Sequence, residues 1–222
     1  MLDLLRDYLP YFLEGFRTTL IASIIALIFS TILGAIMGVL QLNKNKVVST
    51  LANAYVEFFR NIPLLVIVMF FYVAVPMAGI PLPGFQAGII GLTLYTSSFI
   101  ADNVRAGILT IPEGQEEAGL ASGLTRGQVM THIILPQAIR VVIPPLGNQF
   151  INLVKNSSIL AVVAGFDLMY YGDFIAMETF NTFETYILIA IFYLLITLPL
   201  TALVKYLEGK LSLTVETEEG GI

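Results

Sequence analysis

Long uncharged stretches, separated by a few charged residues, dominate this chain of 222 residues. The first stretch runs from Thr18 to Leu40, between Arg17 and Lys44. At a rise of about 1.5 Å per residue, a helix of that length crosses a hydrocarbon core of about 30 Å. The pattern therefore predicts a first membrane-spanning helix over these residues.

The next uncharged stretch, from Asn61 to Ala101, is too long for a single span. The segment PMAGIPLPG at residues 76–84 divides it, because clusters of Pro and Gly favour a turn. Two further apolar stretches follow a polar segment in the middle of the chain. The pattern predicts four more spans, at about 55–75, 85–108, 141–165 and 186–204.

The two ends of the chain differ from the spans. Residues 1–17 carry Asp3 and Asp7 where a signal peptide would be positively charged. Their apolar residues recur at helical spacing, which predicts an amphipathic helix on the membrane surface, with an irregular lead-in as the alternative. Residues 208–222 are acidic, and we expect a disordered cytoplasmic tail. The transmembrane domain then comprises residues 18–207.

Positive residues cluster on one side of the predicted bundle. The first connection, the third connection and the stretch after the fifth span carry Lys44, Lys46, Arg60, Arg105, Arg126, Arg140, Lys205 and Lys210. The second connection has no charge, and the fourth, residues 167–184, has only acids. Because cytoplasmic loops carry the excess of Lys and Arg, we predict an outside N-terminus and a cytoplasmic C-terminus.

Composition agrees with a membrane protein. The chain is 57% hydrophobic and 12% charged, whereas soluble domains carry roughly 25% charged residues. It has no cysteine, and its one histidine, His132, cannot form a zinc site alone. We therefore predict an all-α, multi-pass protein of the cell membrane, with no metal site and no nucleic acid partner.

A polar segment at about residues 110–136 interrupts the apolar pattern. Thr110 and Glu113 match a capping box and predict the start of a helix. Gly123 is typical of the residue that follows a helix C-terminus. Thr125 and Gln128 match a second capping box. The segment therefore predicts two short helices joined by a glycine turn, the second of which ends before Pro136.

Three readings of this segment compete. It could consist of two interfacial helices that only fill space, or of a DNA-binding helix-turn-helix, which its acidic first helix disfavours. The third reading is a docking element for a cytoplasmic partner. The chain contains no GxxxxGK[ST] phosphate loop. If ATP drives transport, the ATPase must therefore be another chain.

The sequence EAGLASGLTRGQVMTHIILP, which begins at Glu117, resembles the EAA loop of ABC importer permeases. Gly119 departs from the pattern, because the family usually has Ala there. The segments FRNIPLL, IADNVRAGI and PPLGNQFINLVKNSS are similar to the polar amino acid uptake subfamily. The resemblance implies a type I importer permease whose coupling helix contacts the ATPase. We assign that coupling role to Glu117, Ala118, Gly119, Gly123 and Thr125.

Polar residues also form a stripe on the fourth span. Asn148, Asn152, Lys155 and Asn156 recur at helical spacing, and Ser157 and Ser158 follow. Polar groups in lipid are costly, so they face the bundle interior or a water-filled path. The alternative is that they join helices through hydrogen bonds. We predict a substrate path lined by Asn148, Asn152, Lys155, Asn156, Ser157, Ser158 and, at a similar depth on the third span, Ser97 and Ser98.

The third span also carries two charges near its predicted cytoplasmic end. Asp102 and Arg105 are three residues apart, so they share a helix face. We predict that they form a structural ion pair. Lys155 is expected to lie in the outer half of the membrane, too far from Asp102 for pairing.

The favoured reading is a permease subunit of an ATP-driven importer for a polar amino acid, and not an enzyme. The resemblance implies a second permease subunit, identical or a sister chain, a cytoplasmic ATPase dimer and an extracytoplasmic binding protein. No cofactor is expected on this chain, since ATP and Mg²⁺ belong to the ATPase. One cation and no acid in the stripe favour a substrate such as glutamine or glutamate. The alternatives are an ion-coupled carrier or channel and, less favoured, a membrane-embedded enzyme.

Overall fold

A computed structural model describes residues 1–219, with side chains described for residues 1–210. Between residues 1 and 219 the chain is helical and contains no strand, as the sequence predicts. The elements are α1 (Leu2–Gln41), α2 (Lys46–Asn61), α3 (Leu64–Met69), the π-helix η1 (Phe70–Ala74), α4 (Val75–Met77), α5 (Gly84–Leu109), α6 (Glu113–Ala121), α7 (Arg126–Val129), the π-helix η2 (Met130–Ile134), α8 (Leu135–Asn156), the 3-10 helix η3 (Ser157–Val163), α9 (Leu168–Thr179) and α10 (Thr182–Glu219).

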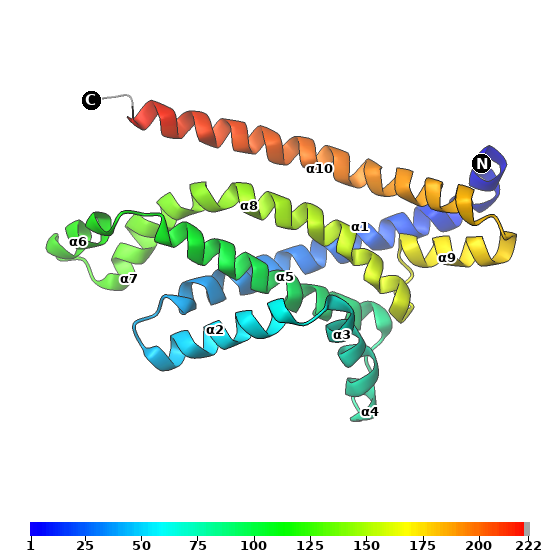
Figure 1. The fold of residues 1–222 in the computed structure, drawn as a ribbon, viewed down its shortest axis with the longest axis horizontal. Coiled ribbons are helices and arrows are strands. Elements are labelled where there is room, and N and C mark those ends of the chain that lie inside the picture. The colour runs from blue at the N-terminus through cyan, green and yellow to red at the C-terminus, as the bar shows by residue number, and fades with distance from the viewer. Residues whose placement is uncertain (220–222) are drawn as a thin grey trace.

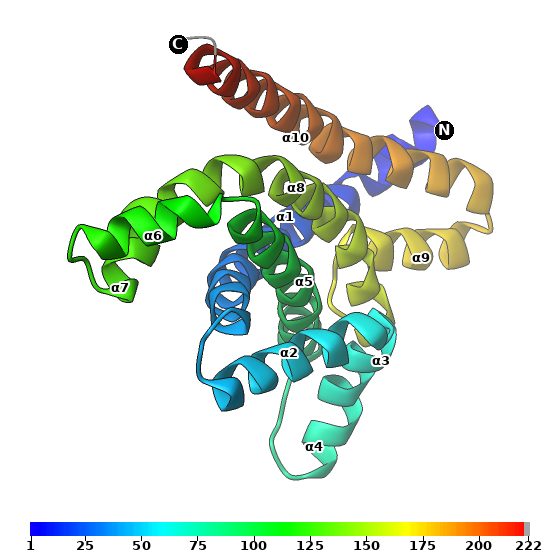
Figure 2. The same ribbon diagram turned by 60° about the vertical axis from the view of Figure 1, so that its left-hand side comes forward.

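The helices form an elongated bundle (Figure 1). At one end of the bundle lie α6 and α7, and at the other lie α9 and the N-terminus, in both views (Figures 1 and 2). The last helix, α10, runs from the α9 end back towards the α6 end. The start of α1 and the far end of α10 therefore lie at opposite ends of the bundle.

Length and composition identify the helices that can cross a membrane. Within the described residues, three continuous helical stretches are long and apolar enough, and a bent pair makes a fourth: Leu2–Gln41, Arg126–Val163, Thr182–Lys210, and Lys46–Asn61 with Leu64–Met77. With its 26 residues, α5 is about 39 Å long. It carries more polar groups but packs against α1, α2, α3 and α8. The count of five spans and their orientation remain predictions.

Two glycines bring α1 and α5 into close contact. A Cβ atom built on Gly34 would lie 2.6 Å from Ile100 Cβ, and one on Gly38 would lie 2.7 Å from the Ala101 carbonyl oxygen. Any larger side chain would therefore push the helices apart. Small residues allow such approaches between helices in membranes, where packing replaces the hydrophobic effect as the main attraction. The pair α1 and α5 forms the centre of the bundle.

The N-terminal segment differs from the surface helix that the sequence suggests. Residues 2–17 continue into the first span as one helix, with Pro10 inside it. Leu4 and Phe12 are buried in a cluster with Leu168 of α9 and Leu188 of α10. The apolar face of this segment is thus covered by protein, because α9 and the start of α10 pack against it.

The second predicted span is a bent helix pair. Helix α2 ends at Asn61, and α3 starts after Pro63, with an angle of 103° between the two parts. Ile62 is extended (φ −101°, ψ 134°), as expected of a residue that precedes proline. Pro63 therefore marks a sharp bend in the chain as well as the start of a helix.

The fourth and fifth spans are longer than the uncharged stretches predict. The chain is helical from Arg126 to Val163, so the second short helix does not stop at Pro136. The π-helix η2 ends two residues before this proline, and a π turn accommodates the carbonyl that proline leaves unbonded. Helix α10 continues to Glu219, through most of the expected disordered tail. The remaining residues of that tail, 220–222, lie outside the described part of the chain.

Candidate functional site

The polar segment leaves α5 through a short turn. The Thr110 hydroxyl donates a hydrogen bond to the Gly107 carbonyl at 2.7 Å. Thr110 thus closes α5, and the capping box predicted from Thr110 and Glu113 is wrong. Helix α6 starts at Glu113 after Pro112, without a side-chain cap. Pro112 disfavours a helical conformation at the residue before it, which separates the two helices.

The glycine turn after α6 is confirmed. Gly123 has φ +85°, a left-handed conformation that glycine adopts without steric cost. Its N–H bonds to the Leu120 carbonyl at 3.0 Å, and the Leu124 N–H bonds to the Gly119 carbonyl at 3.2 Å. This pair of bonds is a Schellman motif, which satisfies carbonyls that the end of a helix leaves free.

The second capping box is also confirmed. The Thr125 hydroxyl accepts the Gln128 N–H at 3.4 Å, and the Gln128 side chain accepts the Thr125 N–H at 2.9 Å. Two backbone donors at the start of α7 are therefore satisfied by side chains. Thr125 has the local role of fixing where the chain turns from α6 into α7.

Gly119 is buried where α6 meets α7 and η2. A Cβ atom at this position would lie 2.8 Å from both Ile133 Cδ1 and Val129 Cγ2. Val129 is only 1% exposed, and a buried β-branched side chain has little freedom to rotate away. Gly119 therefore allows a close contact between the short helices. The space that an alanine would need is filled by Val129 and Ile133.

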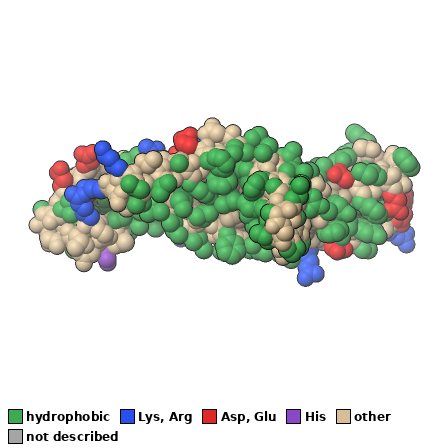
Figure 3. All heavy atoms as spheres, turned by 90° about the horizontal axis from the view of Figure 1, so that it is seen from below, with side chains coloured by type: hydrophobic (Ala, Val, Ile, Leu, Met, Phe, Trp, Pro, Cys, Tyr) green, Lys and Arg blue, Asp and Glu red, His purple; other side chains and the backbone are tan. Residues whose placement is uncertain are grey.

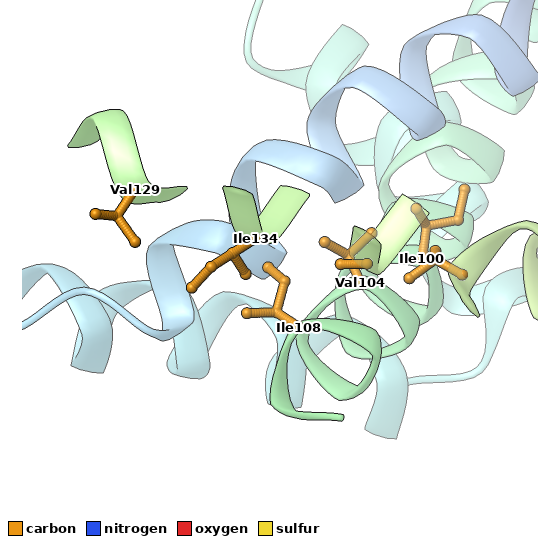
Figure 4. Close-up of a cluster of buried hydrophobic side chains, with 7 residues drawn as sticks. Ile100, Val104, Ile108, Val129 and Ile134 are labelled. Carbon is orange, nitrogen blue, oxygen red and sulfur yellow. The ribbon is translucent and has the colours of Figure 1, made fainter. Parts of the chain in front are cut away.

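Apolar side chains anchor this segment to the bundle. Val129 of α7 and Ile134 of η2 belong to one buried cluster with Ile108, Val104 and Ile100 of α5. Figure 4 shows these side chains following one another from α7 along α5. The outer surface of α6 is polar by contrast, and Glu117 and Ala118 are exposed. The segment is thus fixed on one side and open on the other.

One ion pair links α6 to the turn between α1 and α2. The Lys44 ammonium lies 3.8 Å from the Glu116 carboxylate, and both side chains are exposed to solvent. Exposed pairs of this kind contribute at most about 1 kcal/mol. The contact nonetheless places the first and third connections side by side at the same end of the bundle.

Three of the predicted path residues form an open polar strip on α8. Asn148, Asn152 and Lys155 are exposed. Helix α8 packs against α5 and α10 and more lightly against α1, so this strip faces away from its neighbours in the chain. A polar strip without cover on a membrane-spanning helix requires another protein surface or a water-filled path beside it.

The predicted serines lie inside the bundle. Ser97, Ser98 and Ser157 are 0% exposed, and each hydroxyl donates to a carbonyl one helical turn earlier. The Ser97 hydroxyl also bonds to the Tyr55 hydroxyl of α2 at 2.7 Å. These groups are therefore satisfied within and between helices. Tyr55 was not expected from the sequence, because its partner lies 42 residues away.

Asn156 and Ser158 lie at a cavity near the α9 end. The cavity has a volume of about 320 Å³ and is also lined by Asp173 of α9. The Asp173 carboxylate accepts the Tyr186 hydroxyl at 2.6 Å. Sequence reasoning missed Asp173, since nothing in the pattern predicts that α9 packs beside the end of α8. The structure thus divides the predicted path residues among the strip, the bundle interior and this cavity.

The ion pair predicted between Asp102 and Arg105 is replaced by another. The Asp102 carboxylate lies 3.0 Å from Arg60 Nη1 of α2. The Arg60 guanidinium also lies 5.5 Å from the centre of the Phe99 ring, within range of a cation–π interaction. Asp102 pairs with Arg60 and not with Arg105 because α2 packs against α5.

A buried carboxylate stands at the start of α9. Asp167 is 0% exposed and accepts the N–H groups of Met169 and Tyr170 at 3.2 and 3.1 Å. Burial raises the pKa of this carboxyl from 3.8 to about 6, although the hydrogen bonds act in the opposite direction. The adjacent Leu168 N–H bonds to the Thr19 hydroxyl at 3.0 Å. Asp167 therefore caps α9 from inside the protein.

Charge is separated along the molecule. Figure 3 shows apolar side chains over the middle of one face and most of the charged side chains at its two ends. Within the described residues, no group of three or more His, Asp or Glu side chains is arranged to hold a metal ion. The candidate site thus consists of the polar segment of residues 110–136 at one end, which we call the docking segment for the role predicted above, and an uncovered polar strip on α8 between the ends.

Comparisons with known proteins agree with this architecture. The family of binding-protein-dependent transport system inner membrane components matches residues 30–213. The probable glutamine ABC transporter permease protein GlnM of Bacillus subtilis is 54% identical over 94% of this chain and 97% of its own length. The glutamine transport system permease protein GlnP of Escherichia coli K12 is 33% identical, with 92% and 94% covered. A crystal structure of an amino acid ABC transporter with histidines superposes with a TM-score of 0.85 at 33% identity, covering 93% of this chain and 96% of that one.

Proposed function

Because this chain belongs to the family of inner membrane components of binding-protein-dependent transport systems, we propose that it forms the translocation path of an importer for glutamine or a closely related amino acid. It is a permease of an ABC importer and a multi-pass protein of the cell membrane. The observation that carries the proposal is the combination of α6, which is closed by a Schellman motif and exposed on its outer surface, with an uncovered polar strip on α8. Helix α6 is suited to receiving movement from a partner protein, and the polar strip is suited to guiding a polar solute.

The ATPase contacts α6 in this proposal. Glu117 and Ala118 are exposed on it, while Gly119 sets its packing, Gly123 ends it and Thr125 starts the next helix, α7. A short helix that is rigidly attached on one side fits a groove on a partner. ATP and Mg²⁺ are bound and ATP is hydrolysed on that partner, so this chain carries no cofactor of its own.

A second permease subunit covers the polar strip of α8. Asn148, Asn152 and Lys155 would be costly against lipid, whereas a facing subunit turns them into the wall of a shared path. The subunit is either a second copy of this chain or a sister permease. An extracytoplasmic binding protein delivers the substrate at the α9 end, where Asn156, Ser158 and Asp173 line a cavity.

The substrate assignment has two supports. Relatives that match nearly the whole chain are named glutamine permeases. The exposed strip offers amides and one ammonium, Lys155, and no carboxylate. Amides suit a neutral polar side chain, and the ammonium attracts a carboxylate, which every amino acid carries. Glutamine fits this surface better than a cationic amino acid does.

The decisive experiment is reconstitution of the permease with its ATPase and binding protein in lipid vesicles. We expect glutamine-loaded binding protein to stimulate ATP hydrolysis and to drive glutamine uptake. Arginine should compete poorly. An ATPase subunit that cannot hydrolyse ATP serves as the control and should stop uptake. Uptake by the permease alone, driven by an ion gradient, would contradict the proposal and favour a carrier.

A further inference from the structure

A cavity lies behind the docking segment, between α6 and the rest of the bundle. Its volume is about 580 Å³, within the range of about 300–1,000 Å³ that is usual for small-molecule sites. Its walls come from three parts of the chain that are far apart in sequence: the end of α1 with its following turn, the end of α5, and the segment from α6 to η2. None of the coupling or path residues assigned above lines it.

The polar lining of this cavity contains charges of both signs. Lys44 and Arg126 provide two cations, and Glu113 and Glu116 provide two carboxylates. Asn43 adds an amide. Lys44 and Glu116 are only loosely paired, at 3.8 Å, so each retains hydrogen-bonding capacity for a ligand.

The remaining lining is apolar. Val39 and Leu42 of α1, Ile108 of α5 and Met130 of η2 face the same space. A binding site for an anion alone would not place two carboxylates in its wall, because they would repel the ligand. A site for a hydrocarbon would not carry four charged groups. The lining therefore suits a small molecule that has one positive group, one negative group and a short carbon chain.

We propose that this cavity binds a free amino acid from the same side of the membrane as α6, at a site separate from the translocation path. The inference rests on the proposed function, which places α6 in the cytoplasm and glutamine among the imported molecules. The ammonium of the ligand meets Glu113 or Glu116, and its carboxylate meets Lys44 or Arg126. The bound molecule is then the product of transport.

The position of the cavity gives the ligand a regulatory effect. A molecule that contacts both the α1–α2 turn and α6 stabilises the spacing between them seen here. Binding shifts the population towards this arrangement to the extent that the ligand binds it more tightly than it binds other arrangements of α6 and the α1–α2 turn. Because ATP-driven movement of α6 changes that spacing, accumulated product slows further import.

Single cysteines test the site directly, since the chain has no cysteine of its own. Asn43→Cys places a thiol in the cavity wall, and Lys46→Cys places one at an exposed position three residues away that does not line it. The full permease, purified in lipid nanodiscs, is labelled with a maleimide in the presence of L-glutamine. At a concentration about ten times the Kd, labelling of Asn43→Cys should slow about tenfold, because only the unoccupied fraction reacts. Labelling of Lys46→Cys should not change.

Two analogues test the need for both charges. We expect 4-aminobutanamide, which lacks the carboxylate, and glutaramic acid, which lacks the ammonium, to protect Asn43→Cys much less than glutamine does. Adding Lys44→Met should weaken protection by glutamine. Equal labelling of Asn43→Cys with and without saturating glutamine, equal protection of both cysteines, or full protection by either analogue would overturn the proposal.

Uptake separates the failure of this inference from that of the proposed function. Vesicles with the complete transporter are loaded with glutamine on the ATPase side, and the initial rate is compared with that of unloaded vesicles. We expect internal glutamine to lower the rate for the unmodified permease and to have a smaller effect with Lys44→Met. ATP-driven uptake that internal glutamine leaves unchanged would overturn the regulatory effect alone. If no amino acid is taken up, the proposed function fails, and the labelling experiment still decides the cavity.

Discussion

At the scale of single residues, glycine positions determine how the docking segment packs. Gly114 and Gly119 lie on the same short helix, but a Cβ atom at Gly114 would meet nothing within 4 Å, whereas one at Gly119 would meet Val129 and Ile133 at 2.8 Å. The two positions therefore separate helix propensity from packing. A substitution series at α6 can measure each effect with the same chemistry.

We predict opposite results for Gly114→Ala and Gly119→Ala. Gly114→Ala should stabilise α6 by about 0.5–1 kcal/mol, because alanine loses less conformational freedom. Gly119→Ala should destabilise it by about 1 kcal/mol, because overpacking costs roughly 1–3 kcal/mol. Amide hydrogen exchange within α6 gives the free energy of local opening for each variant. Equal protection in both variants would show that Val129 and Ile133 adjust freely.

Glu117 is predicted to act at the ATPase contact. Glu117→Lys should weaken association with the ATPase at least about tenfold, which corresponds to about 1.4 kcal/mol. The thermal stability of the permease should not change, because the residue is exposed. Gln115→Lys, two residues away and hence on the opposite face of α6, is the control. Co-purification of the ATPase with each variant measures the association. Loss of binding in both variants would argue against a specific role for Glu117.

Residues whose structural role is local could be predicted from the sequence. Gly123 and Thr125 act within three residues of their partners, and glycine and the capping pattern predicted both. The same pattern failed at Thr110, whose hydroxyl bonds back to Gly107. The contacts of residues with distant partners could not be predicted in this way. Arg60 and Asp102 meet only because α2 packs on α5. Ser97 was assigned to a path because its polarity was visible in the sequence and its partner Tyr55 was not. Polarity on a span indicates a partner without identifying it.

At the scale of elements, α8 is the helix along which we propose the substrate path. Asn152 lies on its exposed strip, and Asn156 lies at the cavity beside α9. The hydroxyls on α5 are already used within the bundle. The path is therefore expected to run along α8 and not between α8 and α5.

Replacing both Asn152 and Asn156 by Leu is predicted to abolish glutamine uptake while leaving assembly with the ATPase intact. Leu removes the amides but fills a similar volume, so the helix remains folded. The double Gln variant keeps the amides and should retain part of the uptake. Transport assays and co-purification measure the two properties separately. Normal uptake by the Leu variant would exclude this face of α8 from the path.

The pair between α2 and α5 provides a second test at this scale. Arg60→Gln and Asp102→Asn should each weaken packing of α2 on α5, and the double variant should lose less than the sum, since each single change leaves one charge without its partner. The coupling should stay below about 1 kcal/mol because both side chains are about one third exposed. Thermal unfolding of the unmodified protein, the two single variants and the double variant gives the coupling energy. Strict additivity would indicate that the Arg60–Asp102 contact contributes nothing to stability.

Sequence patterns predicted the helical elements better than their junctions. Uncharged stretches located the spans, but α1 extends beyond its stretch because Leu4 and Phe12 pack against α9 and α10, while its charged side chains stay exposed. Helix α10 also extends beyond its stretch, to Glu219. The junction at Pro136 was expected to end a helix, and the π-helix before it allows the chain to continue. Proline restricts the local backbone, and the neighbouring turn decides whether the helix bends, widens or stops.

At the scale of the whole molecule, the α9 end is predicted to respond to pH through Asp167. Its folded pKa of about 6 lies above the ordinary 3.8, so the folded state binds a proton more tightly than the unfolded state does. The contribution of Asp167 to stability should be greatest below about pH 4 and should fall as the pH rises through about 6. Hydrogen exchange in α9, measured between pH 4 and pH 7, tests the trend. Asp167→Asn keeps a capping side chain without the charge and should remove this dependence.

The contact of α1 with α5 at Gly34 and Gly38 has a mechanical consequence. Two helices that touch along their backbones bend far less than either would alone, so together they act as a stiff beam. One end of that beam continues through residues 110–112 into α6, and the N-terminal half of α1 holds α9 in place through the bond between Thr19 and Leu168. Once α6 has moved against the α1–α2 turn, a further push tilts the beam as a unit, and the torque reaches the far side of the protein.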